Sequence, residues 1–189
     1  MRRVGNYQIK IAESENEFNH IHRLNYKTFV EEIPQHQGNE KGSLIDRFHS
    51  ENTYIIALEG GELAGMIAVR GERPFSLDSK IPDLDQYLPT NKSICEIRLL
   101  AVEKEHRGGP VFFLLMKGLA QYCREMDYNY AVISGTTRQQ KLYRHLGFAP
   151  FYSAVGKKGA CYIPMQAAVE DFEKNLGELI CKYENHHSL

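Results

Sequence analysis

Tryptophan is absent from this sequence of 189 residues, and neither sign of charge is in excess. Lysine and arginine total 23 against 24 aspartates and glutamates, which gives a formal net charge of −1. Proteins that bind nucleic acid through its phosphates usually carry a basic excess, so the overall charge argues against a dedicated nucleic-acid binder. A local basic cluster, Arg138 with residues 141–145, keeps nucleic-acid binding open as an alternative.

Long apolar runs are also missing, and cysteines are few. No stretch approaches the roughly 20 apolar residues that a membrane-spanning helix needs. The charged residues 1–6 are not followed by an apolar segment, so we expect no signal peptide. The four cysteines match no CxxC or metal-ligand spacing, which predicts reduced core thiols in a cytoplasmic protein without a metal site. A nucleophilic role for one of them is the alternative.

The order of secondary-structure signals predicts an α/β protein with a mixed sheet flanked by helices. The length suits one domain. Ser14 and Glu17 form a capping-box pattern that starts a helix, and Pro34 ends it. The glycines of residues 59–62 predict a hairpin turn. Expected strands are 7–12, 53–58, 63–70, 94–102, 130–134, 148–152 and 160–163, and expected helices are 14–33, 111–126, 137–146 and 169–183. Residues 72–91 carry three prolines and predict an irregular segment with a short helix or a substrate-facing loop.

The most informative block is the segment 95–151. It contains a strand ending in Leu-Ala-Val, a His-Arg-Gly-Gly turn before an apolar helix, and a later Leu-Tyr-x-x-x-Gly-Phe motif. In this order the block resembles the GNAT superfamily of N-acyltransferases. The resemblance implies a GNAT-like fold and a pantetheine thioester, acyl-CoA or acyl carrier protein (acyl-ACP), as co-substrate.

The resemblance assigns the thioester-binding residues to the strand end and the turn that follows it. A glycine-rich turn at a helix N-terminus exposes backbone amides that suit a pyrophosphate, although such a turn alone is usually structural. The usual pattern has small residues where this chain has Pro110 and Phe112, and this departure favours a donor carried on acyl carrier protein. The residues implied are Leu100, Ala101, Val102, Arg107, Gly108, Gly109 and Val111.

Two side chains are candidates for proton transfer. The resemblance places the Tyr143 hydroxyl beside the thioester sulfur, where it can protonate the departing thiolate. Glu96, on the strand before the thioester contact, is the candidate base for the incoming ammonium. The alternatives are a buried aromatic residue for Tyr143 and a solvated or salt-bridged carboxylate for Glu96.

The N-terminal half resembles the acyl-homoserine lactone synthases and long-chain N-acyl amino acid synthases, a branch of the same superfamily. This implies that Phe29, Asp46, Arg70 and Arg98 bind the acceptor. The domain 1–189 would then comprise an acceptor-side half (1–92), a thioester-binding core (93–164) and a C-terminal helix (165–189). The alternative for Asp46, Arg47 and His49 is a solvated loop.

The sequence therefore predicts an enzyme that transfers an acyl group from acyl-CoA or acyl-ACP to a primary amine of a small molecule, with amino acids as one acceptor class. One alternative is an acetyl-CoA-dependent N-acetyltransferase of a small amine or peptide. Another is a non-catalytic module that senses an acyl thioester. Residues 112–116 could line an acyl tunnel, but such a run is more often the core face of a helix, and we favour core packing. The sequence leaves the oligomeric state open.

Overall fold

The computed structural model describes residues 2–157 and 160–187, and its elements fall into two compact units. Unit 1 comprises residues 1–70, 98–119 and 158–160, and unit 2 comprises residues 71–97, 120–157 and 161–189. Two elements contribute to both units: strand β5 (Ile94–Val102) and helix α2 (Val111–Glu125). Each unit is therefore described by itself.

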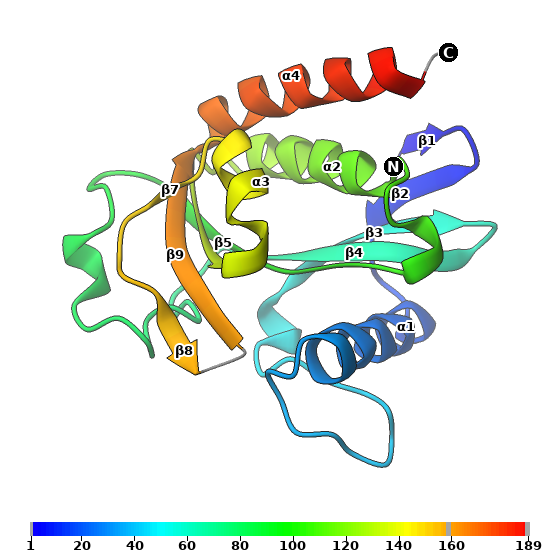
Figure 1. Ribbon diagram of the computed structural model, residues 1–189, viewed down its shortest axis with the longest axis horizontal. Coiled ribbons are helices and arrows are strands. Elements are labelled where there is room, and N and C mark those ends of the chain that lie inside the picture. Colours follow the sequence, from blue (N-terminus) through cyan, green and yellow to red (C-terminus); the bar gives the residue numbers. More distant parts are fainter. Residues whose placement is uncertain (1, 158–159, 188–189) are drawn as a thin grey trace. The chain divides into compact units, whose positions relative to one another are not determined.

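Unit 1 is built on an antiparallel meander (Figure 1). Its strands are β1 (Arg2–Val4), β2 (Tyr7–Ile11), β3 (Thr53–Glu59) and β4 (Glu62–Arg70), followed in the sheet by the later part of β5. β3 and β4 form the predicted hairpin, and Gly60 and Gly61 at its tip have positive φ angles of 60° and 95°. Glycine adopts this backbone conformation without a steric cost.

Helix α1 (Glu15–Tyr26) covers one face of this meander, and the first part of α2 covers the other (Figure 1). The predicted capping box is present, with the Ser14 side chain accepting from the Glu17 amide and the Glu17 carboxylate accepting from the Ser14 amide. The helix continues as a π-helix (Lys27–Glu32), which the sequence did not reveal. Apolar side chains of α1 pack with β3 and β4 in a core that also includes Ala101 of β5.

Strand β5 contains a backbone irregularity at Leu99, whose φ is +53°. A left-handed conformation is unusual for a branched, non-glycine residue and costs of the order of 1–3 kcal/mol. The parallel pairing of β5 with β6 (Tyr130–Thr136) runs from Ile94 to Ile97, just before this residue. The boundary between the two units also falls here, between Ile97 and Arg98.

In unit 2, the early part of β5 pairs with β6, β6 with β9 (Ala160–Ala168), and β9 with β7 (Ala149–Pro150). Strand β8 (Val155–Lys157) also pairs with β9. The helices of this unit are α3 (Gln140–His145), α4 (Val169–His187) and the end of α2. Residues 71–93 pack five apolar side chains against Val132 of β6, so this segment closes a small core of its own.

The final strand pair differs from the prediction. The expected strand 148–152 is only the two-residue β7, and β9 extends to Ala168. The unpredicted β8 includes Gly156 and Lys157, and residues 158 and 159 lie outside the described residues. The helix expected over 137–146 is a 3₁₀ turn (Thr137–Gln139) followed by α3, and the irregular segment holds the short 3₁₀ turn Leu84–Gln86.

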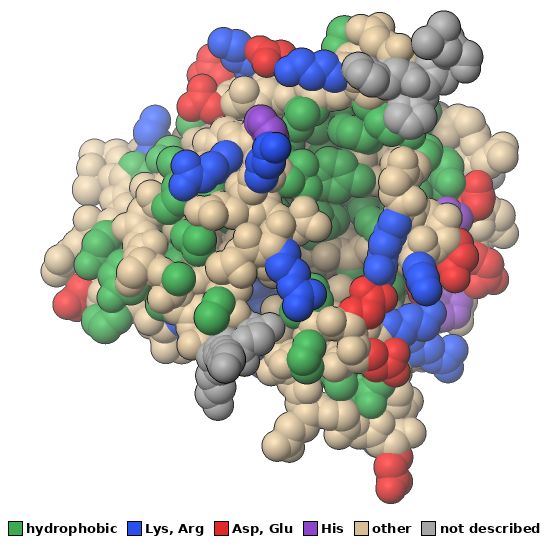
Figure 2. Space-filling model, in the orientation of Figure 1, with side chains coloured by type: hydrophobic (Ala, Val, Ile, Leu, Met, Phe, Trp, Pro, Cys, Tyr) green, Lys and Arg blue, Asp and Glu red, His purple; other side chains and the backbone are tan. Residues whose placement is uncertain are grey.

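The described residues contain neither a candidate membrane-spanning helix nor a candidate metal-binding cluster. No helix there has the length and apolar character to span a membrane. No group of three or more His, Cys, Asp or Glu side chains is placed to hold a metal ion within the described ranges. Positive and negative side chains both occur across the face shown in Figure 2, as expected for a chain with almost no net charge.

Candidate active site

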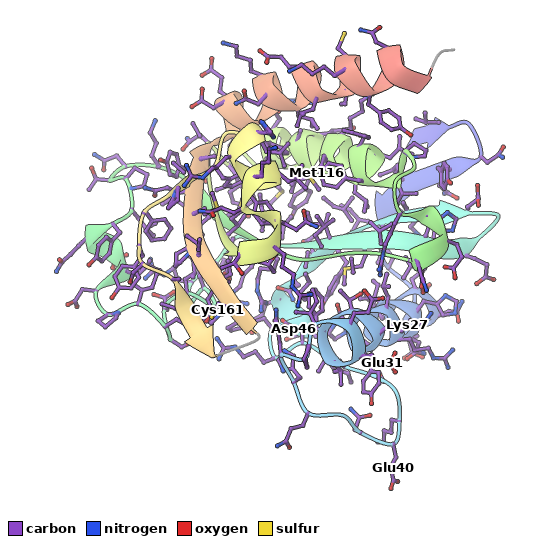
Figure 3. The ribbon with its side chains drawn as sticks, viewed as in Figure 1. Lys27, Glu31, Glu40, Asp46, Met116 and Cys161 are labelled. Carbon is purple, nitrogen blue, oxygen red and sulfur yellow. The ribbon has the colours of Figure 1, made fainter. Side chains whose placement is uncertain are left out.

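The centre of the candidate acceptor region in unit 1 is an ion pair between Asp46 and Arg98. The guanidinium donates to both carboxylate oxygens, at 2.7 and 3.0 Å, and each side chain is only 12% exposed. Burial opposes ionisation of Asp46, but the hydrogen bonds and charge of Arg98 outweigh it and lower the pKa of this carboxyl. Just before Asp46 the chain returns to α1, where the Leu44 amide donates to the His22 carbonyl. Figure 3 shows Asp46 beside this helix.

Three guanidinium groups gather around the ring of Phe48. The guanidinium carbons of Arg70, Arg47 and Arg98 lie 4.0, 4.5 and 4.9 Å from the ring centroid. Arg70 is 1% exposed and forms an ion pair with Glu51. The face of an aromatic ring stabilises such cations, so the Phe48 ring helps to hold three guanidinium groups close together in unit 1.

A chain of hydrogen bonds connects this cluster with α1. The His22 Nε2 and His49 Nδ1 atoms are 3.3 Å apart, and His49 Nδ1 is also 3.3 Å from the Tyr54 hydroxyl. The Asn52 amide donates to that hydroxyl at 3.2 Å and to Asp46 at 3.0 Å. Burial lowers the pKa of His22, and the neighbouring His49 lowers it further. The alternative of a solvated loop is therefore wrong for Asp46 and His49, because both side chains belong to a partly buried hydrogen-bond network.

The turn between β5 and α2 has the expected local structure. Gly108 has a φ of +78°, which favours glycine, and α2 starts at Val111, directly after Pro110. The Arg107 side chain donates to the Val102 carbonyl at 2.9 Å and pairs with Glu32 at 2.8 Å. This hydrogen bond with Glu32 raises the pKa of Arg107, which stays a cation. A bound phosphate would compete with Glu32 for this guanidinium.

Four other candidates of unit 1 lie in the end of β5 or in the π-helical segment. Ala101 is 3% exposed and belongs to the buried cluster beneath α1, whereas Leu100 and Val102 are half-buried. Phe29, in the π-helical segment, is 8% exposed in the same cluster. Phe29 is therefore a core residue in this structure.

Glu96, in unit 2, is completely buried. The Ser76 amide donates to its Oε2 at 2.7 Å, and the Ser76 hydroxyl donates to its Oε1. The interpretation of Glu96 as a solvated carboxylate is therefore wrong. Ser76 therefore donates to both carboxylate oxygens of Glu96 in the interior of unit 2.

Tyr143 lies on α3, with its ring against β6 of unit 2. A Cβ at Gly135 would come within 2.8 Å of this ring, so glycine is what allows the close approach. Burial raises the pKa of Tyr143 above its ordinary value of 10.0, and hydrogen bonds from the side chain and backbone of Thr136 offset part of this increase. The phenol therefore carries its proton at neutral pH, as a general acid must.

Within unit 1 the structure brings together Asp46, Arg70 and Arg98 around Phe48, and their role in acceptor binding stays a prediction. It adds four residues that sequence reasoning missed: Phe48, Asn52, Tyr54 and, in unit 2, Ser76. Phe48 could have been found, because an aromatic residue directly follows Asp46-Arg47 in the sequence. Ser76 carries no such signal, since it lies in a segment without periodicity.

The chain has relatives of known fold. The sequence profile of the family described as N-acyl amino acid synthase FeeM matches residues 20–165. The structure of FeeM, an N-acyl amino acid synthase from uncultured soil microbes, has a TM-score of 0.70 and 19% identity, covering 89% of this chain and 94% of that one. No curated protein sequence matches this chain.

Two further structures have the same fold. BjaI, a CoA-dependent acyl-homoserine lactone synthase solved with MTA, has a TM-score of 0.75 and 18% identity, with 91% of this chain and 89% of that one covered. A putative N-acetyltransferase from Lactobacillus plantarum has a TM-score of 0.63 and 14% identity, with 87% and 99% covered. These similarities confirm the predicted GNAT-like α/β fold class.

Proposed function

Because this chain belongs to the FeeM family of N-acyl amino acid synthases, we propose that it transfers an acyl group from a pantetheine thioester to the amino group of an amino acid. The observation that carries the proposal is the family match over residues 20–165, which includes Asp46, Arg98 and Tyr143. Family membership and fold make the chain an N-acyltransferase. The amino acid acceptor and the donor are the proposed parts.

The acceptor proposal draws on the charge gathered around Phe48. An amino acid differs from a simple amine by its carboxylate, and guanidinium groups bind carboxylates through paired hydrogen bonds. Arg98 already holds one carboxylate, that of Asp46, in this two-pronged manner. We expect Arg98 and Arg70 to attract the acceptor carboxylate, with Asp46 keeping Arg98 in place.

The donor proposal draws on the end of β5 and the turn after it. Leu100, Ala101 and Val102 would bind the pantetheine arm through their backbone, and the first-turn amides of α2 would face the phosphate. BjaI, which shares the fold, has been solved with SAM and isopentyl-CoA. Pro110 offers no amide in the turn, which fits a donor on acyl carrier protein with a single phosphodiester. Acyl-CoA and acyl-ACP are both cytoplasmic acyl donors, so the proposal also locates the protein in the cytoplasm.

The proposed reaction has one bond formed and one broken. The amine nitrogen attacks the thioester carbonyl carbon, forming the C–N bond, and the tetrahedral intermediate collapses with cleavage of the C–S bond. Glu96 accepts the proton lost by the acceptor ammonium, directly or through water, and Tyr143 supplies a proton to the thiolate. The second proton, which the nitrogen loses as the amide forms, returns to the Tyr143 phenolate through water, so that the products are the amide, the free thiol and the proton on Glu96.

A panel of donors and acceptors tests the proposal. The purified chain is incubated with acyl-CoA or acyl-ACP donors of increasing chain length and each amino acid in turn, and products are identified by mass spectrometry. The expected result is an N-acyl amino acid, with methyl esters of the same amino acids reacting poorly because they lack the carboxylate. Acetyl transfer to amines without a carboxylate, and no long-chain product, would contradict it.

A non-catalytic acyl-thioester sensor remains the second candidate, because Pro110 and the half-buried Phe112 depart from the usual phosphate turn. The two candidates differ in turnover. If the chain binds an acyl thioester but never releases free thiol with any acceptor, the sensor is favoured and the enzyme is excluded.

A further inference from the structure

The buried face of α1 carries polar groups that find no hydrogen-bond partner among the described residues. Asn25 is 0% exposed, and both its amide nitrogen and its amide oxygen lack a partner. One turn later, Thr28 is 7% exposed and its hydroxyl oxygen also lacks one. Most buried polar groups in proteins are hydrogen-bonded, and leaving them unsatisfied is destabilising, so this pair requires an explanation.

The position of the pair on the helix is informative. Leu24 and Phe29, on the same face, pack in the buried cluster that includes Ala101 of β5. Thr28 belongs to the π-helical segment, a geometry that recurs at functional sites. Asn25 thus lies in the last turn of α1 and Thr28 in the π-helical segment that follows it, next to residues of the cluster that includes Ala101.

Two ion pairs fasten this segment to the same region of unit 1. Lys27 pairs with Glu103 at 2.9 Å, directly after β5. Glu32 pairs with Arg107 in the turn that precedes α2. The helix segment is therefore tied to both elements that we assigned to the thioester donor.

The chemistry of the two side chains selects one kind of ligand. A carboxamide both donates and accepts, and so does a hydroxyl, and their surroundings in the α1 cluster are apolar. A carboxylate would require a positive charge, and a hydrocarbon chain needs no polar partner. A neutral secondary amide, with one N–H and one C=O, is the complementary group. The pantetheine arm contains two such amides.

We propose that Asn25 and Thr28 form a hydrogen-bonding subsite for an amide of the pantetheine arm. The proposal rests on the proposed function, since it requires a pantetheine donor on the end of β5. It assigns donor recognition to α1, in addition to the backbone of Leu100, Ala101 and Val102. It also explains why two polar residues occupy buried positions where leucine or valine would fit the apolar surroundings.

The test replaces Asn25 by leucine, which has a similar volume and no polar atoms, and compares donors with one acyl chain. Octanoyl-CoA and octanoyl-pantetheine carry both amides, whereas the octanoyl thioester of 2-mercaptoethanesulfonate carries none. We expect Asn25→Leu to lose about tenfold in kcat/KM with the first two donors and nothing with the third. Its urea midpoint should not fall, because an unsatisfied buried group has been removed.

Thr28→Val should give the same donor pattern with a smaller loss. Asn19→Leu, the same substitution on an exposed position of α1, is the matched control and should leave all three donors unchanged. An equal loss of kcat/KM on all donors would show a structural role and overturn the proposal. No loss on any donor would show that the pair is satisfied by buried water only, which overturns it too.

A binding measurement separates this proposal from the proposed function. The non-reactive thioether S-octyl-CoA is titrated calorimetrically into the wild type and Asn25→Leu. Weaker binding to the variant supports the subsite even if the wild type acylates no amino acid. Equal binding, with an active wild type, refutes the subsite and leaves the proposed function intact.

Discussion

Removing the carboxylate of Asp46 is expected to destabilise unit 1 strongly. In Asp46→Asn the remaining carbonyl oxygen keeps the 2.7 Å bond from Arg98, but an NH2 group replaces the oxygen that accepts the 3.0 Å bond. Arg98 thus loses one hydrogen bond and its counter-charge in a site where both side chains are 12% exposed. Leaving a largely buried guanidinium without its carboxylate costs about 3 kcal/mol of unfolding free energy. Phe48 and Asn52 keep a carbonyl acceptor at position 46, so the loss comes chiefly from Arg98.

Urea denaturation followed by circular dichroism measures this loss. The matched control is Glu103→Gln, which removes the same charge from an ion pair with the half-exposed Lys27 and should cost about 0–1 kcal/mol. A loss below 1 kcal/mol for Asp46→Asn, or equal losses for the two variants, would refute the reasoning. It would mean that the Asp46–Arg98 pair does not hold this part of the structure.

The pH dependence of the same difference provides an independent check. Because the pKa of Asp46 is lowered on folding, its stabilising contribution is fully present above the unfolded value, near 3.8. It is lost as the pH falls through the lower folded-state pKa. The gap between the wild type and Asp46→Asn should thus be constant above about pH 5 and shrink in acid.

Three further outcomes follow from the structure. Gly135→Ala places a Cβ within 2.8 Å of the Tyr143 ring. It should lower kcat at least tenfold, which corresponds to about 1.4 kcal/mol in activation free energy. The control Gly177→Ala, with open space around the new Cβ, should leave kcat unchanged. Tyr143→Phe should slow thiol release, measured with a thiol reagent, by about 10²-fold or more. In the wild-type pH–rate profile, the alkaline fall in rate should lie above pH 10, because burial raises the pKa of Tyr143. The pKa of His22 is lowered by burial and by His49, so thermal stability should fall as the pH drops below 6.5, and His22→Leu should weaken this dependence.

Local signals in the sequence predicted the parts of the fold that depend on local chemistry. The capping box at Ser14 and the Gly60-Gly61 turn are present because one backbone group and one side chain a few residues away decide them. Strands β7, β8 and β9 were placed less well, since their lengths depend on pairing between segments far apart in sequence. Hydrophobic periodicity carries no information on that pairing.

The candidate site shows the same division. Asp46 and Arg98 were named through resemblance, but 52 residues separate them and no pattern in the chain predicts their two hydrogen bonds. Burial decides their chemistry, and burial is a property of the folded chain. The unsatisfied amide of Asn25 is a still clearer case, since only packing distinguishes it from the exposed Asn19 on the same helix.

The left-handed residue Leu99 has a consequence for how this protein can change over evolution. Strand β5 holds the candidate base Glu96 before this residue and the backbone proposed for the donor after it. The conformational reversal separates these two stretches, so a substitution that improves one need not rotate the side chains of the other. Glycine at position 99 would relieve the strain. It would also make the β5 backbone more flexible at this position, between the two stretches through which acceptor and donor specificity can be altered independently.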